Sequence, residues 1–475
     1  MNLEKQSNTF LSLIRDGQPM TLKQQLRLTA QLSMPAIMAQ VSSIVMQYID
    51  ASMVGSLGAN ASASIGLVST TTWLFWGVCT SVATGFSVQV AHCIGAGDRK
   101  RARTVLRQSI VATLLFSFLL LAVGCGISGV LPMWLGGDTS IAHDASLYFL
   151  IFAVSLPALQ LSFLGGSMLR CSGNMFVPSL LNVLMCVLDV VFNLFLIFPS
   201  REWQCLDFTL SLPGAGLGVV GAALGTGLAE VVTAVLMMWF LCFRSPDLKL
   251  TKEHGNFLPK ADCLKRALRI SLPMGAEHII LCGAQIMTTV IVAPLGVVAI
   301  AANSFAITAE SLCYMPGYGI ADAATTLVGQ SIGAGRLELT KRFAHITVLL
   351  GMVVMGVMGV VMYVAAPWMM GVMTPDAEVL SLGVMALRIE AFAEPMFAAS
   401  IVGYGVFVGA GDTLIPSAMN LGSIWAVRLT LAAWLAPMMG LQGVWIAMCI
   451  ELCFRGSIFL FRLWRGKWLK LGKLQ

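Results

Sequence analysis

The sequence predicts an all-α integral membrane protein with 12 transmembrane helices in two six-helix bundles, and composition, apolar spacing and an internal repeat support this fold class. Of the 475 residues, 57% are hydrophobic and only 11% are charged, whereas soluble domains carry about 25% charged residues. The chain therefore lacks the polar surface to cover a water-soluble globule of its size. No polar stretch divides it, so we expect one membrane domain.

Apolar segments recur at fairly even spacing, and each is long enough to cross about 30 Å of hydrocarbon as a helix of roughly 20 residues. Strands of an outer-membrane barrel would instead alternate apolar and polar positions, which the run 114–123 does not do. We expect the spans near 28–54, 61–93, 104–135, 143–169, 176–199, 216–243, 267–294, 298–332, 341–372, 379–408, 414–437 and 441–462.

An internal repeat divides the chain into two halves. Four motifs recur with a constant offset of 238 residues: Pro35 with Pro273, Gly58 with Gly296, Gly95 with Gly333, and Gly173 and Pro178 with Gly411 and Pro416. We expect bundles at 1–243 and 267–475, the second with a cytoplasmic tail, joined by a cytoplasmic linker at 244–266. An even number of helices per repeat gives both halves the same orientation, which predicts a pseudo-twofold axis along the membrane normal.

Basic residues gather in alternate connections. Of the 29 Lys and Arg residues, 25 fall in the two termini and the even-numbered connections, and such residues accumulate on the cytoplasmic side of membranes. We therefore expect a multi-pass protein of the plasma (inner) membrane with both termini cytoplasmic. This sidedness also explains the net charge of +6 without a nucleic-acid partner.

Two parallel halves around a central cleft are typical of secondary transporters, in which rocking of the halves gives alternating access. A membrane enzyme would need a nucleophile paired with a base or a metal motif, and the sequence contains no HExxH motif. The 12 cysteines are scattered singly and read as packing residues. We expect no enzyme activity and no cofactor beyond a coupling ion, and the repeat disfavours a passive channel.

Several motifs resemble the multidrug and toxic compound extrusion (MATE) family. They are "MPAIMAQVSSIVMQYIDASMVGSLG" at 34–58, "VQVAHCIGAGD" with its partner "LVGQSIGAG", the paired "G(N/D)xxxPSxxN" elements, "VLDVVFN" at 187–193 and "GLGVVGAALGT" at 216–226. The resemblance runs from about Leu26 to Leu463 and implies the MATE/MOP-type fold. It also implies export of cationic, amphipathic drugs or metabolites in exchange for H+ or Na+.

Asp50 is the foremost candidate for cation coupling, because a carboxylate at membrane depth is costly and is a functional candidate by default. It lies about four turns after Pro35, where the missing backbone donor permits a helix bend. In the family that the chain resembles, an aspartate at the position of Asp50 binds the coupling ion. Protonation of that aspartate is proposed to bend the helix at the proline. The alternative is that Asp50 caps the end of its helix.

The resemblance also implies roles for Asp189 and Thr226, which match a cation site of the DNA-damage-inducible (DinF-like) branch. Two carboxylates and a hydroxyl suit Na+ at Asp50, Asp189 and Thr226, whereas two nearby carboxylates also suit a proton. The branch usually has an asparagine where this chain has Met185. Asn182 or Asn193 can substitute, but the departure favours H+ somewhat.

The predicted spans of the second half contain four carboxylates at membrane depth: Glu277, Glu310, Glu390 and Glu394. Another branch of the family carries acids at the positions of Leu281 and Phe397, so its roles do not transfer directly. The glutamates either line the substrate cleft and attract cations, or form buried ion pairs with Arg388 and Arg428. We expect Glu230 and Glu451 to bond to neighbouring helices.

The leading hypothesis is a monomeric antiporter in the lipid bilayer that exports small-molecule organic cations. The nearest rival is a flippase of a lipid-linked precursor in the same superfamily. Such a flippase would more often show extra helices and a cleft rich in Lys and Arg, whereas the buried charge here is mostly acidic.

Overall fold

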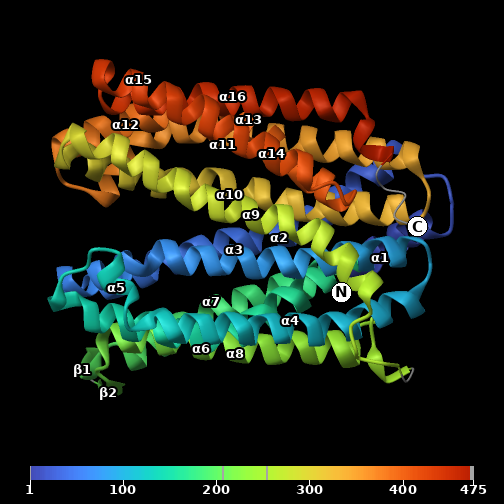
Figure 1. The fold of residues 1–475 in the computed structure, drawn as a ribbon, viewed down its shortest axis with the longest axis horizontal. Coiled ribbons are helices and arrows are strands. Elements are labelled where there is room, and N and C mark those ends of the chain that lie inside the picture. The colour runs from blue at the N-terminus through green and yellow to red at the C-terminus, as the bar shows by residue number, and fades with distance from the viewer. Residues whose placement is uncertain (1, 206–207, 253–254, 471–475) are drawn as a thin grey trace.

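A computed structural model describes residues 2–205, 208–252 and 255–470. Its long helices lie side by side, and both chain termini lie at one end of the molecule (Figure 1). In the first half the elements are α1 (Asn2–Arg15), α2 (Leu22–Gly55), α3 (Ala59–Gly95), α4 (Arg99–Ser128), α5 (Leu131–Trp134), α6 (Thr139–Cys171), α7 (Phe176–Leu196), β1 (Pro199–Cys205), β2 (Phe208–Ala215) and α8 (Gly218–Trp239). In the second half they are α9 (Ala261–Val292), α10 (Val297–Gly333), α11 (Leu337–Met373), α12 (Ala377–Glu390), α13 (Glu394–Gly409), α14 (Leu414–Gly422), α15 (Thr430–Met439) and α16 (Leu441–Arg465).

The predicted number of spans is confirmed. In the described part of the chain, 11 helical segments are long and apolar enough to cross a membrane, and a bent pair of helices makes the twelfth span. The bent pair is a correction, because the sequence predicts one helix over 379–408. The structure divides this span into α12 and α13, which meet at 61°. Pro395 in the first turn of α13 cannot donate a backbone hydrogen bond, which accounts for the break.

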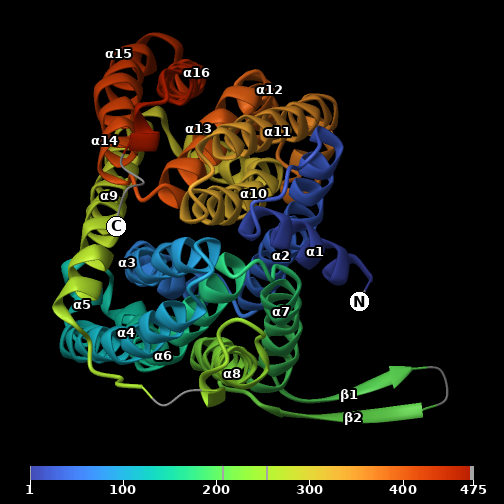
Figure 2. The same cartoon turned by 90° about the vertical axis from the view of Figure 1, so that its right-hand side faces the viewer.

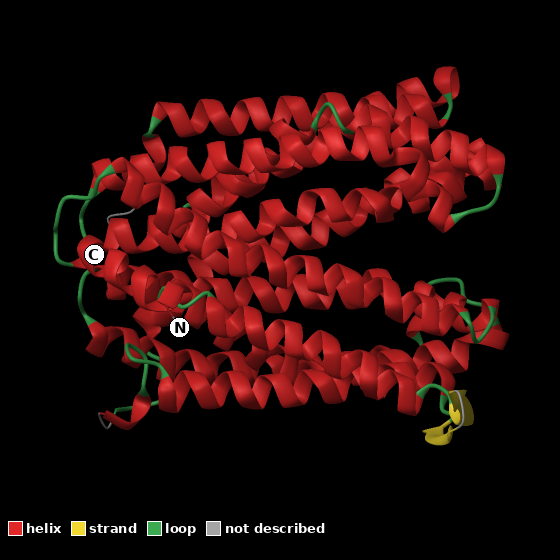
Figure 3. Cartoon of the chain, turned by 180° about the vertical axis from the view of Figure 1, so that it is seen from behind, coloured by secondary structure: helices red, strands yellow, loops and turns green. Residues whose placement is uncertain are grey.

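Three further features depart from the predicted elements. The third span, expected to reach residue 135, ends at Ser128, and Pro132 lies in the first turn of the separate short helix α5. A hairpin of β1 and β2, which the sequence did not predict, joins α7 to α8 at the end of the molecule away from the termini (Figure 3). The eleventh span contains a π-helical segment, Ser423–Leu429, between α14 and α15.

The helices form two groups, one from each half of the chain (Figure 2). The first membrane-spanning helix of each half packs against the second membrane-spanning helix of the other half: α2 lies against α10, and α9 lies against α3. This exchange of partners is what a pseudo-twofold axis between the halves requires. Helix α2 starts at a capping box in which Thr21 and Gln24 satisfy each other's backbone donors, and it continues unbroken through Pro35.

Helices α3 and α10 meet at the end of the molecule that holds the termini. A side chain on Gly95 would overlap the carbonyl of Gln330, and one on Gly333 would overlap the carbonyl of His92. These two glycines occupy the repeated "IGAG" motif. The repeat therefore encodes the close backbone approach that holds the two bundles together at this end.

Candidate cation site

The two candidate aspartates of the first bundle meet at a single asparagine. The Asn193 Nδ2 atom on α7 donates to Asp50 Oδ1 on α2 at 3.0 Å and to Asp189 Oδ2 one turn earlier on α7 at 3.2 Å. Asp189 and Asn193 are fully buried, whereas Asp50 is half-buried. One amide group thus bridges two carboxylates from two helices at membrane depth.

Helix α8 completes the wall of this site. Gly225 lies so close to Asn193 that any side chain there would overlap the amide oxygen. Its neighbour Thr226 interacts with the Asp189 carboxylate. All four oxygen-bearing residues, Asp50, Asp189, Asn193 and Thr226, therefore lie in one place between α2, α7 and α8.

Two oxygens at this site lack a hydrogen-bond donor. Asp189 Oδ1 and Asn193 Oδ1 are buried and accept no hydrogen bond from the described residues. Buried acceptors normally have a partner, and a proton or a hard cation supplies one. The donor set consists only of oxygens and fits either H+ or Na+. The described residues contain no group of three or more His, Cys, Asp or Glu side chains suited to a metal ion.

Asn182 lies elsewhere on α7. Its Nδ2 atom donates to Ser43 Oγ at 3.0 Å and to the Ala39 carbonyl at 3.4 Å, so it ties α7 to a more N-terminal part of α2. Of the two asparagines considered from the sequence, the structure therefore brings only Asn193 between the carboxylates.

Pro35 is far along α2 from Asp50, at the contact with α10. Gly319 of α10 approaches the α2 backbone there, and a Cβ on residue 319 would lie 2.6 Å from the nitrogen of Ile37. A small residue on α10 therefore leaves room for α2 directly beside the proline that permits a bend.

Glu277 belongs to a polar network that sequence reasoning missed. Its two carboxylate oxygens accept from Asn420 Nδ2 and from the Tyr404 hydroxyl, each at 2.7 Å, and Tyr404 also contacts Ser417 Oγ at 3.1 Å. The repeat held the signal for this network. Asn420 and Glu277 stand 238 residues after Asn182 and Ala39, which contact each other in the first half.

The other three candidate glutamates of the second half, Glu310, Glu390 and Glu394, are also buried. Glu390 and Glu394 flank the bend between α12 and α13, and none of their carboxylate oxygens has a hydrogen-bond partner among the described residues. Glu310 on α10 is 6% exposed. In this conformation these side chains do not line an open cleft.

The structure does not show the ion pairs considered for these glutamates. Arg428 bonds instead to Glu451 Oε2, at 3.0 Å from Nε and 2.6 Å from Nη2. Arg455 and Ser423 bond to the same carboxylate, which explains how Glu451 is held at depth. Arg388 donates to the carbonyl of Tyr363 at 3.3 Å and stacks on its ring.

Comparison with known proteins agrees with this architecture. The MatE family model matches residues 35–195 and 273–434, one match in each half of the chain. The probable multidrug resistance protein NorM of Thermotoga maritima is 25% identical over 442 residues, which cover 93% of this chain and 92% of that protein. The multidrug resistance protein NorM of Burkholderia vietnamiensis is 25% identical over 444 residues, with 92% of each chain covered.

Solved structures confirm the predicted fold. An outward-facing MATE transporter of the MOP superfamily superimposes with a TM-score of 0.87 at 20% identity, covering 97% of this chain and 98% of its own. A MATE transporter in the straight conformation gives 0.86 at 20% identity, with the same coverage. Because the family model matches more than half of the chain, in both halves, the protein belongs to the MatE family and is a multi-pass membrane transporter, not an enzyme.

Proposed function

We propose that the protein is a secondary active antiporter that exports organic cations, drugs or related metabolites in exchange for H+ or Na+. The observation that carries this proposal is the pair of carboxylates at membrane depth, Asp50 and Asp189, bridged by Asn193. The names of the relatives, which are multidrug resistance proteins, support the class of cargo.

The coupling ion acts by relieving repulsion at this pair. Two negative charges close together and away from water are costly, so binding of one cation stabilises the site. We favour H+ for two reasons. The Asn193 amide donates its hydrogen bonds to the two carboxylates, and Met185, one turn before Asp189, contributes no oxygen ligand for Na+. Na+ held by Asp50, Asp189, Thr226 and the Asn193 oxygen is the alternative.

Alternating access requires the two bundles to separate at one end and close at the other. Several hydrogen bonds between the bundles lie at the end that holds the termini: Thr326 Oγ1 donates to the Arg170 carbonyl at 3.0 Å, Gln330 Nε2 donates to the Cys171 carbonyl at 2.8 Å, and a ring nitrogen of His92 lies 2.8 Å from the Gly409 carbonyl. Toward the other end, the Tyr48 hydroxyl donates to the Thr308 carbonyl at 2.7 Å. With both termini cytoplasmic in the inner membrane, as the basic residues favour, this is an outward-facing state.

The units that move are the bundles 1–243 and 267–475, and residues 244–266 form the linker. We assign the chain to the DinF-like branch, since Asp189 and Thr226 lie together while Leu281 and Phe397 carry no charge. A monomer suffices for this mechanism, because both bundles come from one chain.

The decisive experiment is transport by purified protein in liposomes. We expect an imposed proton gradient without Na+ to drive efflux of an ethidium-like cation, and a Na+ gradient at fixed pH to drive little. Asp50→Asn and Asp189→Asn should each abolish gradient-driven efflux, whereas the exposed Asp138→Asn on the same bundle should transport normally. Efflux by Asp50→Asn at the wild-type rate would show that the coupling site is misassigned. Efflux driven only by a Na+ gradient would show that the coupling ion is Na+ and not H+.

A further inference from the structure

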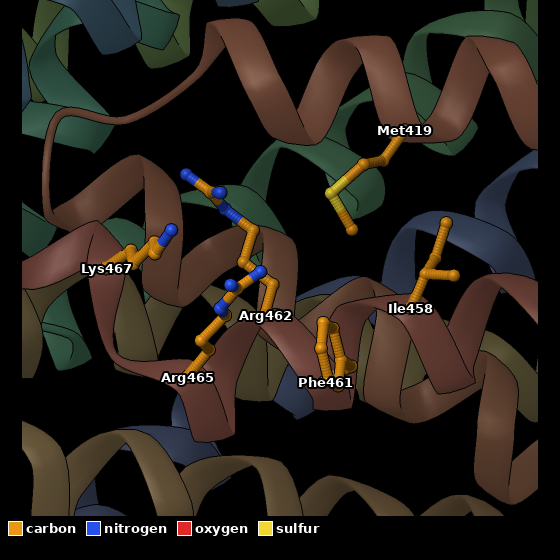
Figure 4. A pocket seen from close by; sticks show the side chains of 6 residues that line it. All are labelled: Met419, Ile458, Phe461, Arg462, Arg465 and Lys467. Atoms are coloured by element: carbon orange, nitrogen blue, oxygen red, sulfur yellow. The ribbon is translucent and has the colours of Figure 1, made fainter.

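A pocket of about 290 Å³ opens on the outside of the second bundle, between α14 and the end of α16. Three apolar and three cationic side chains line it: Met419, Ile458, Phe461, Arg462, Arg465 and Lys467. The two kinds lie on opposite sides, with the cations grouped together toward the end of the chain (Figure 4). The pocket takes no part in the cation site, which lies in the first bundle.

Two of the cations are held in position by their neighbours. Arg462 forms an ion pair with the buried Asp412, just before α14, and its guanidinium lies 5.4 Å from the centre of the Phe407 ring. The Arg465 guanidinium lies 5.8 Å from the centre of the Phe461 ring. Planar guanidinium groups fixed in this way are suited to bind the oxygens of a phosphate.

Lys467 reaches the pocket because the chain turns back after α16. Gly466 ends the helix with φ 66, a conformation that favours glycine. Trp468 is then fully buried, its indole nitrogen donates to the Leu463 carbonyl at 3.3 Å, and its ring lies 5.9 Å from that of Phe407. The buried tryptophan fixes this turn and with it the backbone of Lys467.

The pocket carries excess positive charge. Asp412 offsets the charge of Arg462, while Arg465 and Lys467 are exposed and form no ion pair within the described ranges 2–205, 208–252 and 255–470. The last membrane span ends at Arg465, so these cations lie at the edge of the hydrocarbon. Beside them, the exposed side chains of Phe461, Phe454 and Ile450 follow one face of α16 into the membrane.

We propose that this pocket binds the phosphate headgroup of an anionic phospholipid from the leaflet on the side of the termini. The cations contact the phosphodiester oxygens, and an acyl chain follows the apolar face of α16. Basic pockets between helices at the membrane surface suit such headgroups, and the apolar wall distinguishes a lipid from a soluble phosphate.

Native mass spectrometry of the full-length protein in detergent tests this assignment, with phosphatidylglycerol and phosphatidylcholine of the same acyl chains as probes. We expect the wild type to retain phosphatidylglycerol selectively. The exposed pair Arg465→Gln with Lys467→Gln should bind it about tenfold more weakly or worse. The matched control, Lys100→Gln with Arg101→Gln, removes two exposed charges from the first bundle and should bind like the wild type.

Three outcomes would overturn the proposal. Equal losses in the pocket variant and the control would indicate general charge attraction, and unchanged binding in the pocket variant would place the lipid elsewhere. Competition with glycerol phosphate distinguishes a lipid headgroup from a soluble phosphate as the ligand. If it displaces the lipid at comparable concentration, the pocket is a site for soluble anions; failure to displace the lipid supports the lipid assignment.

Discussion

At the scale of single residues, the cation site depends on how Asn193 divides its hydrogen bonds. One Nδ2 group serves both Asp50 and Asp189, and the amide oxygen faces Gly225 with no donor among the described residues. The asparagine therefore fixes the separation of two carboxylates while leaving oxygens for a cation. An uncharged residue thus has as large a structural role at this site as the acids themselves.

Replacing Asn193 tests that role. Asn193→Ala removes two hydrogen bonds to carboxylates, each worth about 1.5–3 kcal/mol, so the acids lose their fixed geometry. We expect gradient-driven efflux in liposomes to fall about tenfold or more, since about 1.4 kcal/mol corresponds to that factor. Asn182→Ala is the control, because its partners are Ser43 and a backbone carbonyl. Equal losses in both variants would mean that helix packing, not the bridge, was measured.

The network around Glu277 gives a second test. Tyr404→Phe keeps the ring but removes the hydroxyl that donates to the carboxylate at 2.7 Å. A buried acceptor left without its donor costs about 1–3 kcal/mol, and we expect the apparent Tm of the purified protein to fall by about 2–4 °C. Tyr363→Phe should leave Tm unchanged, since only its carbonyl and ring make contacts with Arg388. No difference between the two variants would contradict a stabilising role for the network.

At the scale of elements, the short helix α1 connects parts of both bundles at the end of the molecule that holds the termini. Arg15 bonds to Asp247 at 3.4 Å and to the Ser172 carbonyl at 3.1 Å, both in the first half or just after it. Arg336 of the second half donates to the Leu13 carbonyl at 3.0 Å. The buried side chains of Leu11 and Ile14 pack in the same cluster. Helix α1 is therefore positioned to stabilise closure at this end.

Weakening α1 should favour opening at the termini. Arg15→Gln removes the charge that pairs with Asp247, so we expect a cysteine placed at Thr326 in a cysteine-free background to react several-fold faster with a polar thiol reagent. Lys23→Gln is the matched control, because Lys23 is exposed at the start of α2 and makes no hydrogen bond or ion pair with α1 among the described residues. The same labelling rate in wild type and Arg15→Gln would exclude a role for α1 in closure.

At the scale of the whole molecule, closure depends on backbone contact between the halves. The repeated glycines Gly95 and Gly333 allow α3 and α10 to touch where larger residues would collide. Because both halves contribute one such glycine, the closed interface follows the pseudo-twofold symmetry of the fold. Hydrogen bonds from Thr326 and Gln330 then bind the halves across the same interface.

A single methyl group should disturb this closure. Gly333→Ala places a Cβ against the His92 carbonyl, so we expect spin labels on the two bundles to report larger separations at the end with the termini, together with slower efflux. Gly126→Ala on α4 adds the same methyl where no atom lies within 4 Å and should behave as the wild type. An unchanged distance distribution for Gly333→Ala would count against closure through this glycine contact.

Much of the architecture was predictable because it depends on patterns within the sequence. Apolar segments of membrane length predict the spans, and the constant offset between Pro35 and Pro273 predicts two like halves. The acids Asp50 and Asp189 stand out because charge at membrane depth is costly. The bend between α12 and α13 was missed, since Pro395 permits a break without requiring one and the composition of the span is unchanged by it.

The sequence by itself determined the number of spans, the repeat and the acids of the first bundle. Only the tertiary structure decided that Asn193 and not Asn182 bridges those acids and that Arg428 pairs with Glu451. It also decided that α1 contacts both halves of the chain. The physical reason is that hydropathy and spacing depend on each helix alone. Which side chains meet depends on the rotation and depth of each helix, and these are set by packing between segments far apart in the chain.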